Sequence, residues 1–143
     1  VKSYDTKMIL AKLPFDLRSK ILMHMYREVI EKIRFFNNDD DIFLTDVCSR
    51  FEPFGCTAGA FVFQRGEKGG SMFIVAKGEL EVLDHDRLTQ IGKLVEGDCF
   101  GVDSVFGVSK RQCTVRSISS VSLLVIPLED LQDLCDMYPQ MEA

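Results

Sequence analysis

The sequence predicts an α+β fold in which N-terminal helices lead into an antiparallel, jelly-roll-like β-roll that is followed by one more helix. Two observations carry this prediction. Before Pro53 apolar residues recur at helical three- and four-residue steps, whereas after it short β-rich runs alternate with glycine-containing turns. With 143 residues the chain is long enough for one domain with a sizeable core.

The first part of the chain shows three helical segments. Apolar spacing predicts an amphipathic helix over Phe15–Arg34, and Pro14 suits its first turn. A shorter helix is expected over Ser3–Lys12. The acidic run at 39–41 is expected to cap a third helix, Ile42–Phe51. The apolar face of that third helix consists of Phe43, Leu44 and Val47.

The second part of the chain reads as short strands, and many such strands with turn glycines indicate an antiparallel roll or barrel. The expected strands are Ala60–Phe63, Met72–Val75, Glu79–Leu83, Thr89–Gly92, Cys113–Ser117 and Ser122–Ile126. A last amphipathic helix is predicted over Leu128–Met137, directly after Pro127. Its apolar side carries Leu128, Leu131, Leu134 and Cys135.

Composition excludes several classes of protein. No apolar run approaches the roughly 20 residues of a membrane span. The net charge of −5 argues against nucleic acid, which needs a clustered basic surface. The five cysteines are too irregularly spaced for a CxxC zinc site, and we expect reduced, mostly buried thiols of a cytosolic domain. They are Cys48, Cys56, Cys99, Cys113 and Cys135.

Nothing in the sequence indicates an enzyme. No Ser–His–Asp set, catalytic carboxylate pair or Walker-type loop is apparent. Of the two histidines, His24 is expected to pack in the core or to form an interhelical hydrogen bond. His85 falls in Asp84-His85-Asp86-Arg87, which is typical of a hairpin tip. We therefore predict no metal site and no cofactor.

One continuous motif carries a family resemblance. Between Gln64 and Val82 the chain reads Gly66-Glu67-x-Gly69-x-x-Met72-Phe73-Ile74, followed by Gly78 and a short strand. This order closely resembles the β-roll of cyclic-nucleotide-binding domains. Upstream, the spacing of Leu13-Pro14, Leu17-Arg18, Ile21 and His24 is similar to the C-linker of cyclic-nucleotide-gated, hyperpolarisation-activated and ether-à-go-go-type channels.

The resemblance extends over about Lys12 to Met141 and implies a domain division. Residues 1–36 would be part of the linker helices, and residues 37–143 the β-roll domain. In the family a further helix follows the roll and covers the ligand, and we expect the present chain to stop before that lid. The same roll also occurs in soluble kinase-regulatory and interaction modules, which remain an alternative.

The resemblance also implies a ligand site, the phosphate cassette, in which a short helix and an arginine hold a phosphate. Backbone N–H groups at a helix N-terminus favour an anion, and a guanidinium forms charge-assisted bonds to it. Phe100-Gly101 and Arg111 fall on the family pattern without a gap. The ligand-binding residues implied in this way are Leu94, Phe100, Gly101, Val102, Asp103, Ser104, Arg111, Gln112, Cys113 and Thr114.

Val102 departs from the family pattern. It replaces a glutamate that accepts a hydrogen bond from the ribose 2′-hydroxyl, and valine has no acceptor. A lost charge-assisted bond costs about 1.5–3 kcal/mol, or roughly ten- to hundredfold in affinity. Gln112 is a second departure, at a position where the family carries small residues or threonine.

These features predict a cytosolic regulatory domain of a tetrameric cation channel that senses cyclic AMP or cyclic GMP weakly and couples it to gating. Neighbouring subunits of a homo- or heterotetramer would be its partners, and the membrane would be reached only through the rest of the chain. A different small anion, or a homology domain that works without any ligand, is the alternative consistent with Val102.

Overall fold

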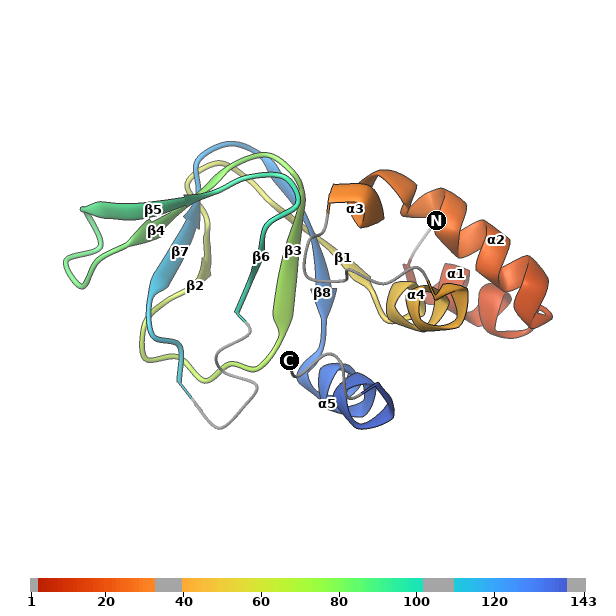
Figure 1. The fold of residues 1–143 in the computed structure, drawn as a ribbon. Coiled ribbons are helices and arrows are strands. Elements are labelled where there is room, and N and C mark those ends of the chain that lie inside the picture. The colour runs from red at the N-terminus through yellow and green to blue at the C-terminus, as the bar shows by residue number, and fades with distance from the viewer. Residues whose placement is uncertain (1–2, 33–39, 102–109, 139–143) are drawn as a thin grey trace.

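The computed structural model describes residues 3–32, 40–101 and 110–138, and it confirms the α+β class with helices beside an antiparallel β-roll (Figure 1). The helices are α1 (Ser3–Ala11), α2 (Phe15–Met25), α3 (Arg27–Lys32), α4 (Asp41–Ser49) and α5 (Leu128–Met137). The strands are β1 (Glu52–Cys56), β2 (Phe61–Phe63), β3 (Met72–Lys77), β4 (Leu80–Leu83), β5 (Gln90–Leu94), β6 (Cys99–Phe100), β7 (Thr114–Ser117) and β8 (Val121–Ile126).

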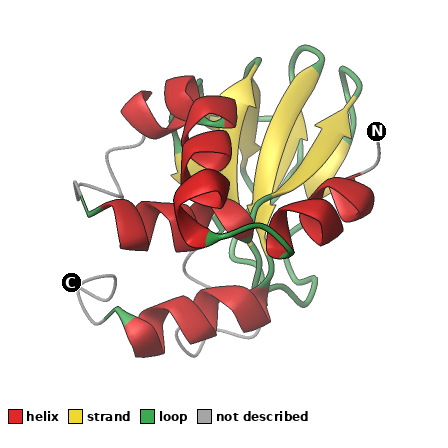
Figure 2. Ribbon diagram, turned by 90° about the vertical axis from the view of Figure 1, so that its right-hand side faces the viewer, coloured by secondary structure: helices red, strands yellow, loops and turns green. Residues whose placement is uncertain are grey.

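The strands form two four-stranded sheets. One has the order β1-β8-β3-β6 and the other β2-β7-β4-β5, and every pairing within them is antiparallel. The helices gather along the outer face of the first sheet, while the second sheet faces its inner side (Figures 1 and 2). The first sheet is therefore the middle layer of the molecule.

The middle layer is apolar on both faces, which explains the unbroken apolar run of β3. Side chains alternate along a strand, so Met72 and Ile74 join the core under the helices. Phe73 and Val75 join the second core, between the sheets. All four side chains are at most 9% exposed. A strand covered on both sides lacks the polar alternation of a half-exposed strand.

The prediction of one long helix over Phe15–Arg34 is wrong. Up to residue 32, where the described segment ends, the helix is interrupted at Tyr26 and divides into α2 and α3. Tyr26 has φ −111° and ψ 14°, outside the helical region. Its ring packs edge-on against Phe51, with the centroids 5.1 Å apart. The helical periodicity continues across the break because Val29 and Ile30 of α3 pack on the same core.

The predicted helix boundaries at α4 and α5 hold to within two residues. Asp40 caps α4, because its carboxylate accepts a hydrogen bond from the Ile42 N–H at 2.9 Å. Pro127 occupies the N-cap of α5. The predicted apolar residues of α4 are all buried, namely Phe43, Leu44 and Val47. In α5 Leu131, Leu134 and Cys135 are buried and Leu128 packs partly buried against them.

Sequence reasoning missed β1 and β6. The first contains Pro53 and Gly55, both of which disfavour a strand interior. It lies at the edge of its sheet, where a residue without an N–H is tolerated, and pairs with β8 from Glu52 opposite Val125 to Cys56 opposite Val121. The second is only two residues long and has no periodicity to detect.

Two expectations about side-chain burial are wrong. His24 is exposed, because α2 directs it away from the core that buries Leu22. All five cysteines are free thiols, as expected, but only Cys48 and Cys135 are buried. The other three lie in or beside strands of the roll, where they are partly exposed.

The β4–β5 hairpin ends in the expected turn, and Asp86 holds that turn together. Its carboxylate accepts hydrogen bonds from the N–H groups of Leu88 and Thr89, both at 2.9 Å, and from the Thr89 hydroxyl at 2.6 Å. The Thr89 hydroxyl and the two N–H groups lower the pKa of Asp86 to about 2 from its ordinary 3.8.

We predict that Asp86→Asn lowers the thermal unfolding temperature at neutral pH and has no effect in strong acid. A carboxyl group with a lowered pKa in the folded state stabilises the fold above its unfolded pKa, and this stability is lost as the pH falls through the folded pKa. The difference between wild type and variant should thus shrink from about pH 4 to about pH 2. Glu129→Gln, an exposed substitution on α5, is the control. A difference that stays constant down to pH 2 contradicts this assignment.

Candidate functional site

A cavity of about 280 Å³ opens beside β6 and the start of β7. Six of its lining residues come from strands of both sheets, and the others flank β6 and β7. They are Phe63, Val82, Leu94, Cys99, Phe100, Gly101, Lys110, Arg111, Gln112, Cys113 and Val115.

The motif of glycine and glutamate holds the backbone of Arg111. The Gly66 N–H donates to the Arg111 carbonyl at 2.9 Å, and the Arg111 N–H donates to the Glu67 carbonyl at 2.8 Å. Lys68 and Lys110 add an antiparallel bridge one step further along the chain. The turn after β2 thus places Arg111 at the cavity, although the two segments are more than forty residues apart in sequence.

The Arg111 side chain lies inside the roll and is only 6% exposed. Its guanidinium donates to the carbonyl oxygens of Gly101, at 2.9 Å, and Ser71, at 3.1 Å. The guanidinium carbon also lies 4.2 Å from the centre of the Phe63 ring and 5.6 Å from that of Phe73, within the range of a cation–π contact. Burial lowers the pKa of Arg111, but an arginine stays charged at neutral pH.

Two glycines make room for this guanidinium. A Cβ atom on Gly69 would lie 1.9 Å from Nε of Arg111, closer than any non-bonded contact allows. Gly101 has φ +86°, a conformation that favours glycine, and a Cβ there would lie 2.8 Å from Nη1 of Arg111. Gly69 and Gly101 are therefore needed to leave space for the Arg111 side chain, and not only to form turns.

Apolar groups form the rest of the cavity wall. Phe73 and Phe100 stack with ring centroids 5.1 Å apart and an interplanar angle of 13°, and the Phe63 ring packs against both. Burial, with a contribution from Asp98, raises the pKa of the Cys99 thiol to about 12. Cys99 is thus a neutral thiol at physiological pH and acts as an apolar wall residue.

The structure brings six of the ten residues implied by the resemblance to one cavity. They are Leu94, Phe100, Gly101, Arg111, Gln112 and Cys113. Thr114 is buried apart from the lining, and its hydroxyl accepts a hydrogen bond from the Arg65 N–H at 3.0 Å. Val102, Asp103 and Ser104, with the expected cassette helix, lie outside the described residues.

The sequence-based selection missed part of the wall. Phe63, Val82 and Val115 line the cavity from β2, β4 and β7, and Lys110 adds a second cation. The register pairs Val82 with Val115, so these two valines lie on one face of the second sheet. Only the strand pairing reveals this, because the two positions are far apart in sequence. Ile91, in the same strand as Leu94, is 60% exposed and is not part of the lining.

The lining residues suit a small amphipathic anion. Arg111 and Lys110 supply positive charge at one end, while Leu94, Val82 and the aromatic rings offer an apolar surface. Gln112 directs its amide to the Lys110 carbonyl at 3.2 Å and is exposed at the rim. Within residues 3–32, 40–101 and 110–138, no cluster of three or more His, Cys, Asp or Glu residues is arranged to hold a metal ion.

A family model described as "Cyclic nucleotide-binding domain" matches residues 56–138. This segment makes up more than half of the chain and contains every residue that lines the cavity. The chain belongs to the cyclic nucleotide-binding domain family. In this family setting the arginine-containing cavity is the natural candidate for the ligand site.

Curated relatives of this cyclic nucleotide-binding domain are channel proteins. The chain is 26% identical over 147 residues to a cyclic nucleotide-gated cation channel of Ictalurus punctatus. This match covers 99% of the chain and 22% of that protein. It is 27% identical over 144 residues to the human cyclic nucleotide-gated channel alpha-2, and this match covers 96% of the chain and 22% of the relative. It is also 27% identical over 148 residues to the cyclic nucleotide-gated channel rod photoreceptor subunit alpha of Gallus gallus, and this match covers 99% of the chain and 23% of the relative.

The chain spans only about a fifth of the length of these relatives. Because the similarity extends over nearly the whole chain, it includes the N-terminal helices as well as the roll. None of the helices described here has the length and apolar character needed to cross a membrane.

Proposed function

We propose that this domain is the cytosolic, non-enzymatic regulatory module of a cation channel, and that it binds cyclic AMP or cyclic GMP weakly in the Arg111 cavity. The observation that carries the proposal is a buried arginine and an apolar wall within one cavity of a cyclic nucleotide-binding domain. The phosphate would replace backbone carbonyls as the partner of the guanidinium. The purine would lie against Leu94 and Val82.

Coupling to gating would pass through the helices. Residues 1–36 are proposed to be part of the linker between the pore and the roll, although the boundary itself lies outside the described residues. Leu10 and Leu22 belong to the same buried core as Met72 and Ile74 of β3. A shift of β3 on ligand binding would therefore act directly on α1 and α2. The subunits of a tetramer would be the partners that receive this movement.

We predict that Val102→Glu tightens cyclic nucleotide binding by roughly ten- to hundredfold, because the carboxylate restores an acceptor for the ribose 2′-hydroxyl. Isothermal titration of the 143-residue chain with cyclic AMP and with cyclic GMP measures this change. Val102→Gln is the matched control, since it adds a similar volume and a neutral acceptor and should give a smaller gain.

Two outcomes contradict the proposal. Absence of heat for both nucleotides in the wild type and in Val102→Glu, up to millimolar ligand, would exclude binding at this site. Equal affinity of the two proteins for a nucleotide that does bind would mean that residue 102 does not face the ribose. 2′-Deoxy cyclic AMP is the ligand control: it lacks the hydroxyl and should bind both proteins alike, so a gain that persists with it would not come from the ribose contact.

A ligand-independent homology domain is the second candidate, and one observation favours it. The Arg111 guanidinium already binds the Ser71 and Gly101 carbonyls and lies on the Phe63 ring. A nucleotide must compete with these contacts. If neither nucleotide binds while Arg111 variants still destabilise the roll, the arginine serves the fold alone.

A further inference from the structure

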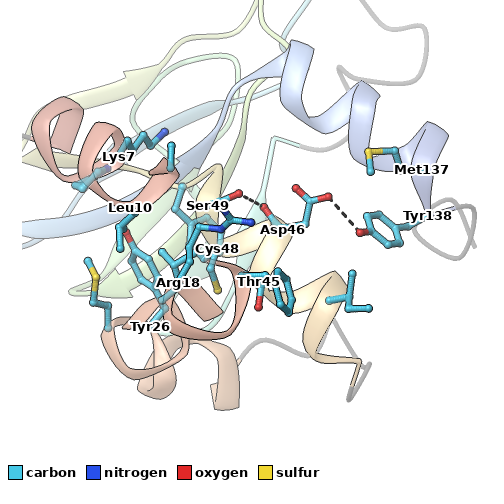
Figure 3. A pocket seen from close by; sticks show the side chains of 17 residues that line it. Lys7, Leu10, Arg18, Tyr26, Thr45, Asp46, Cys48, Ser49, Met137 and Tyr138 are labelled. Carbon is cyan, nitrogen blue, oxygen red and sulfur yellow. Dashed lines mark hydrogen bonds between the residues drawn. The ribbon is translucent and has the colours of Figure 1, made fainter. Parts of the chain in front are cut away.

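A second and larger cavity lies on the opposite side of the middle sheet, among the helices. It has a volume of about 740 Å³, within the roughly 300–1,000 Å³ of small-molecule sites. Its walls come from α1, α2, α4 and the end of α5 (Figure 3). It shares no lining residue with the Arg111 cavity.

The surface of this helical cavity is mainly apolar. Leu10, Leu22 and Phe51 form its buried part. At the rim Met25 and Ile42 remain 48% and 59% exposed. Apolar side chains that line a concave surface and stay accessible to water favour a ligand with an apolar body.

Most polar groups of the lining already have partners within the protein. The Asp46 carboxylate accepts from the Tyr138 hydroxyl at 3.2 Å, and the Ser49 hydroxyl donates to the Asp46 carbonyl (Figure 3). The same carboxylate also accepts from Arg50 at 3.0 Å. The Thr45 hydroxyl is paired with the Ser19 hydroxyl at 2.8 Å. These groups therefore offer little to a ligand.

The two cations of the lining differ from each other. Lys7 lies 3.6 Å from the Glu52 carboxylate, which balances its charge. Arg18 is half-buried; its guanidinium donates to the Leu13 carbonyl at 3.5 Å, and the guanidinium carbon lies 5.8 Å from the centroid of the Phe15 ring. In the part of the chain that the structure describes, no carboxylate lies within ion-pair distance of Arg18.

We propose that the helical cavity is a second ligand site, which takes a small amphiphile with an apolar body and one acidic group. The apolar walls would cover the body, and Arg18 would bind the acidic group with charge-assisted hydrogen bonds. A neutral apolar molecule leaves the Arg18 charge uncompensated and binds less tightly. This site is distinct from the cyclic nucleotide site, since the two cavities share no lining residue and lie on opposite faces of the middle sheet.

Two fluorescent probes that differ by one sulfonate test the charge requirement. 8-Anilinonaphthalene-1-sulfonate should bind the 143-residue chain saturably at one site, and about tenfold more tightly than the neutral N-phenyl-1-naphthylamine. Arg18→Gln should reduce the affinity for the sulfonate about tenfold and leave the neutral probe unchanged. Arg18→Lys should restore most of the loss, and Lys20→Gln, an exposed substitution on the same helix, should have no effect.

A steric pair of variants tests the location. Ala11 lines the cavity from α1 and is exposed, so Ala11→Trp should block both probes without disturbing the core. Ala58→Trp, in the exposed turn after β1, should block neither. Sodium decanoate should displace the sulfonate probe more effectively than decanol does.

Three results would overturn the proposal. The first is an unchanged sulfonate affinity in Arg18→Gln that has the circular dichroism and unfolding temperature of the wild type. The second is equal affinity for the two probes in the wild type. The third is displacement of the sulfonate by cyclic AMP with retained binding in Ala11→Trp, which would assign the probe to the Arg111 cavity.

Discussion

Arg111→Met is expected to abolish cyclic nucleotide binding and to lower the free energy of unfolding by about 2 kcal/mol. Methionine preserves the apolar length of the side chain but leaves the partly buried carbonyls of Gly101 and Ser71 without their charged donor. It also removes the cation–π contact with Phe63. Relief from burying a guanidinium offsets part of this loss, which keeps the expected figure below the sum of the contacts.

Urea unfolding and isothermal titration measure the two effects, with Arg116→Met as the matched control. Arg116 also lies on an aromatic ring, that of Phe61 at 5.8 Å, and binds the Glu81 carboxylate at 2.7 Å. It is not part of the cavity lining. The control should lose some stability and keep its affinity for the nucleotide. Unchanged affinity in Arg111→Met would remove the arginine from the ligand site.

Arg50→Met is expected to lower the free energy of unfolding by about 2 kcal/mol and to loosen the packing of α5 against α4. The side chain of Arg50 is only 15% exposed and meets three carboxylates. Nε lies 3.0 Å from Asp46, and Nη1 lies 3.3 Å from Asp130 and 2.8 Å from Asp133. Without the guanidinium these three negative charges repel one another across the junction of the two helices.

Hydrogen exchange of the α5 amides detects this loosening, and added salt should reduce the repulsion in the variant. Lys32→Met is the control, because its ion pair with Glu96 at 2.7 Å is about half exposed on both sides and exposed pairs contribute little. Equal stability of the Arg50 and Lys32 variants would show that the Arg50 cluster does not hold α5 in place.

The Arg50 cluster also shows where sequence reasoning stops. Asp130 and Asp133 lie off the apolar side of α5, where charged side chains are usually solvated, yet both bind an arginine some eighty positions earlier. Local periodicity correctly identifies the buried face of α5, because that face repeats along the helix. A partner that approaches from another element leaves no periodic signal.

The residues of the candidate site likewise fall into those that the sequence motif identified and those that only the three-dimensional packing reveals. The Gly66-Glu67 motif and the distance from Phe100 to Arg111 were sufficient to bring most of the implied residues to one cavity. Val82 and Val115 were missed because only the pairing of β4 with β7 places them together. The inward orientation of Arg111, and the clearance that Gly69 provides for it, depend on packing that no single segment encodes.

The burial of β3 on both faces has a mechanical consequence. Phe73 lies under the Arg111 guanidinium, and its neighbours Met72 and Ile74 lie under the helices. Because β3 is paired with β8 and β6, a shift of this strand within its sheet would move both sets of side chains at once. A displacement that begins at the arginine would thus reach the helical core through this one strand, with no intermediate residues between the two sides of the domain.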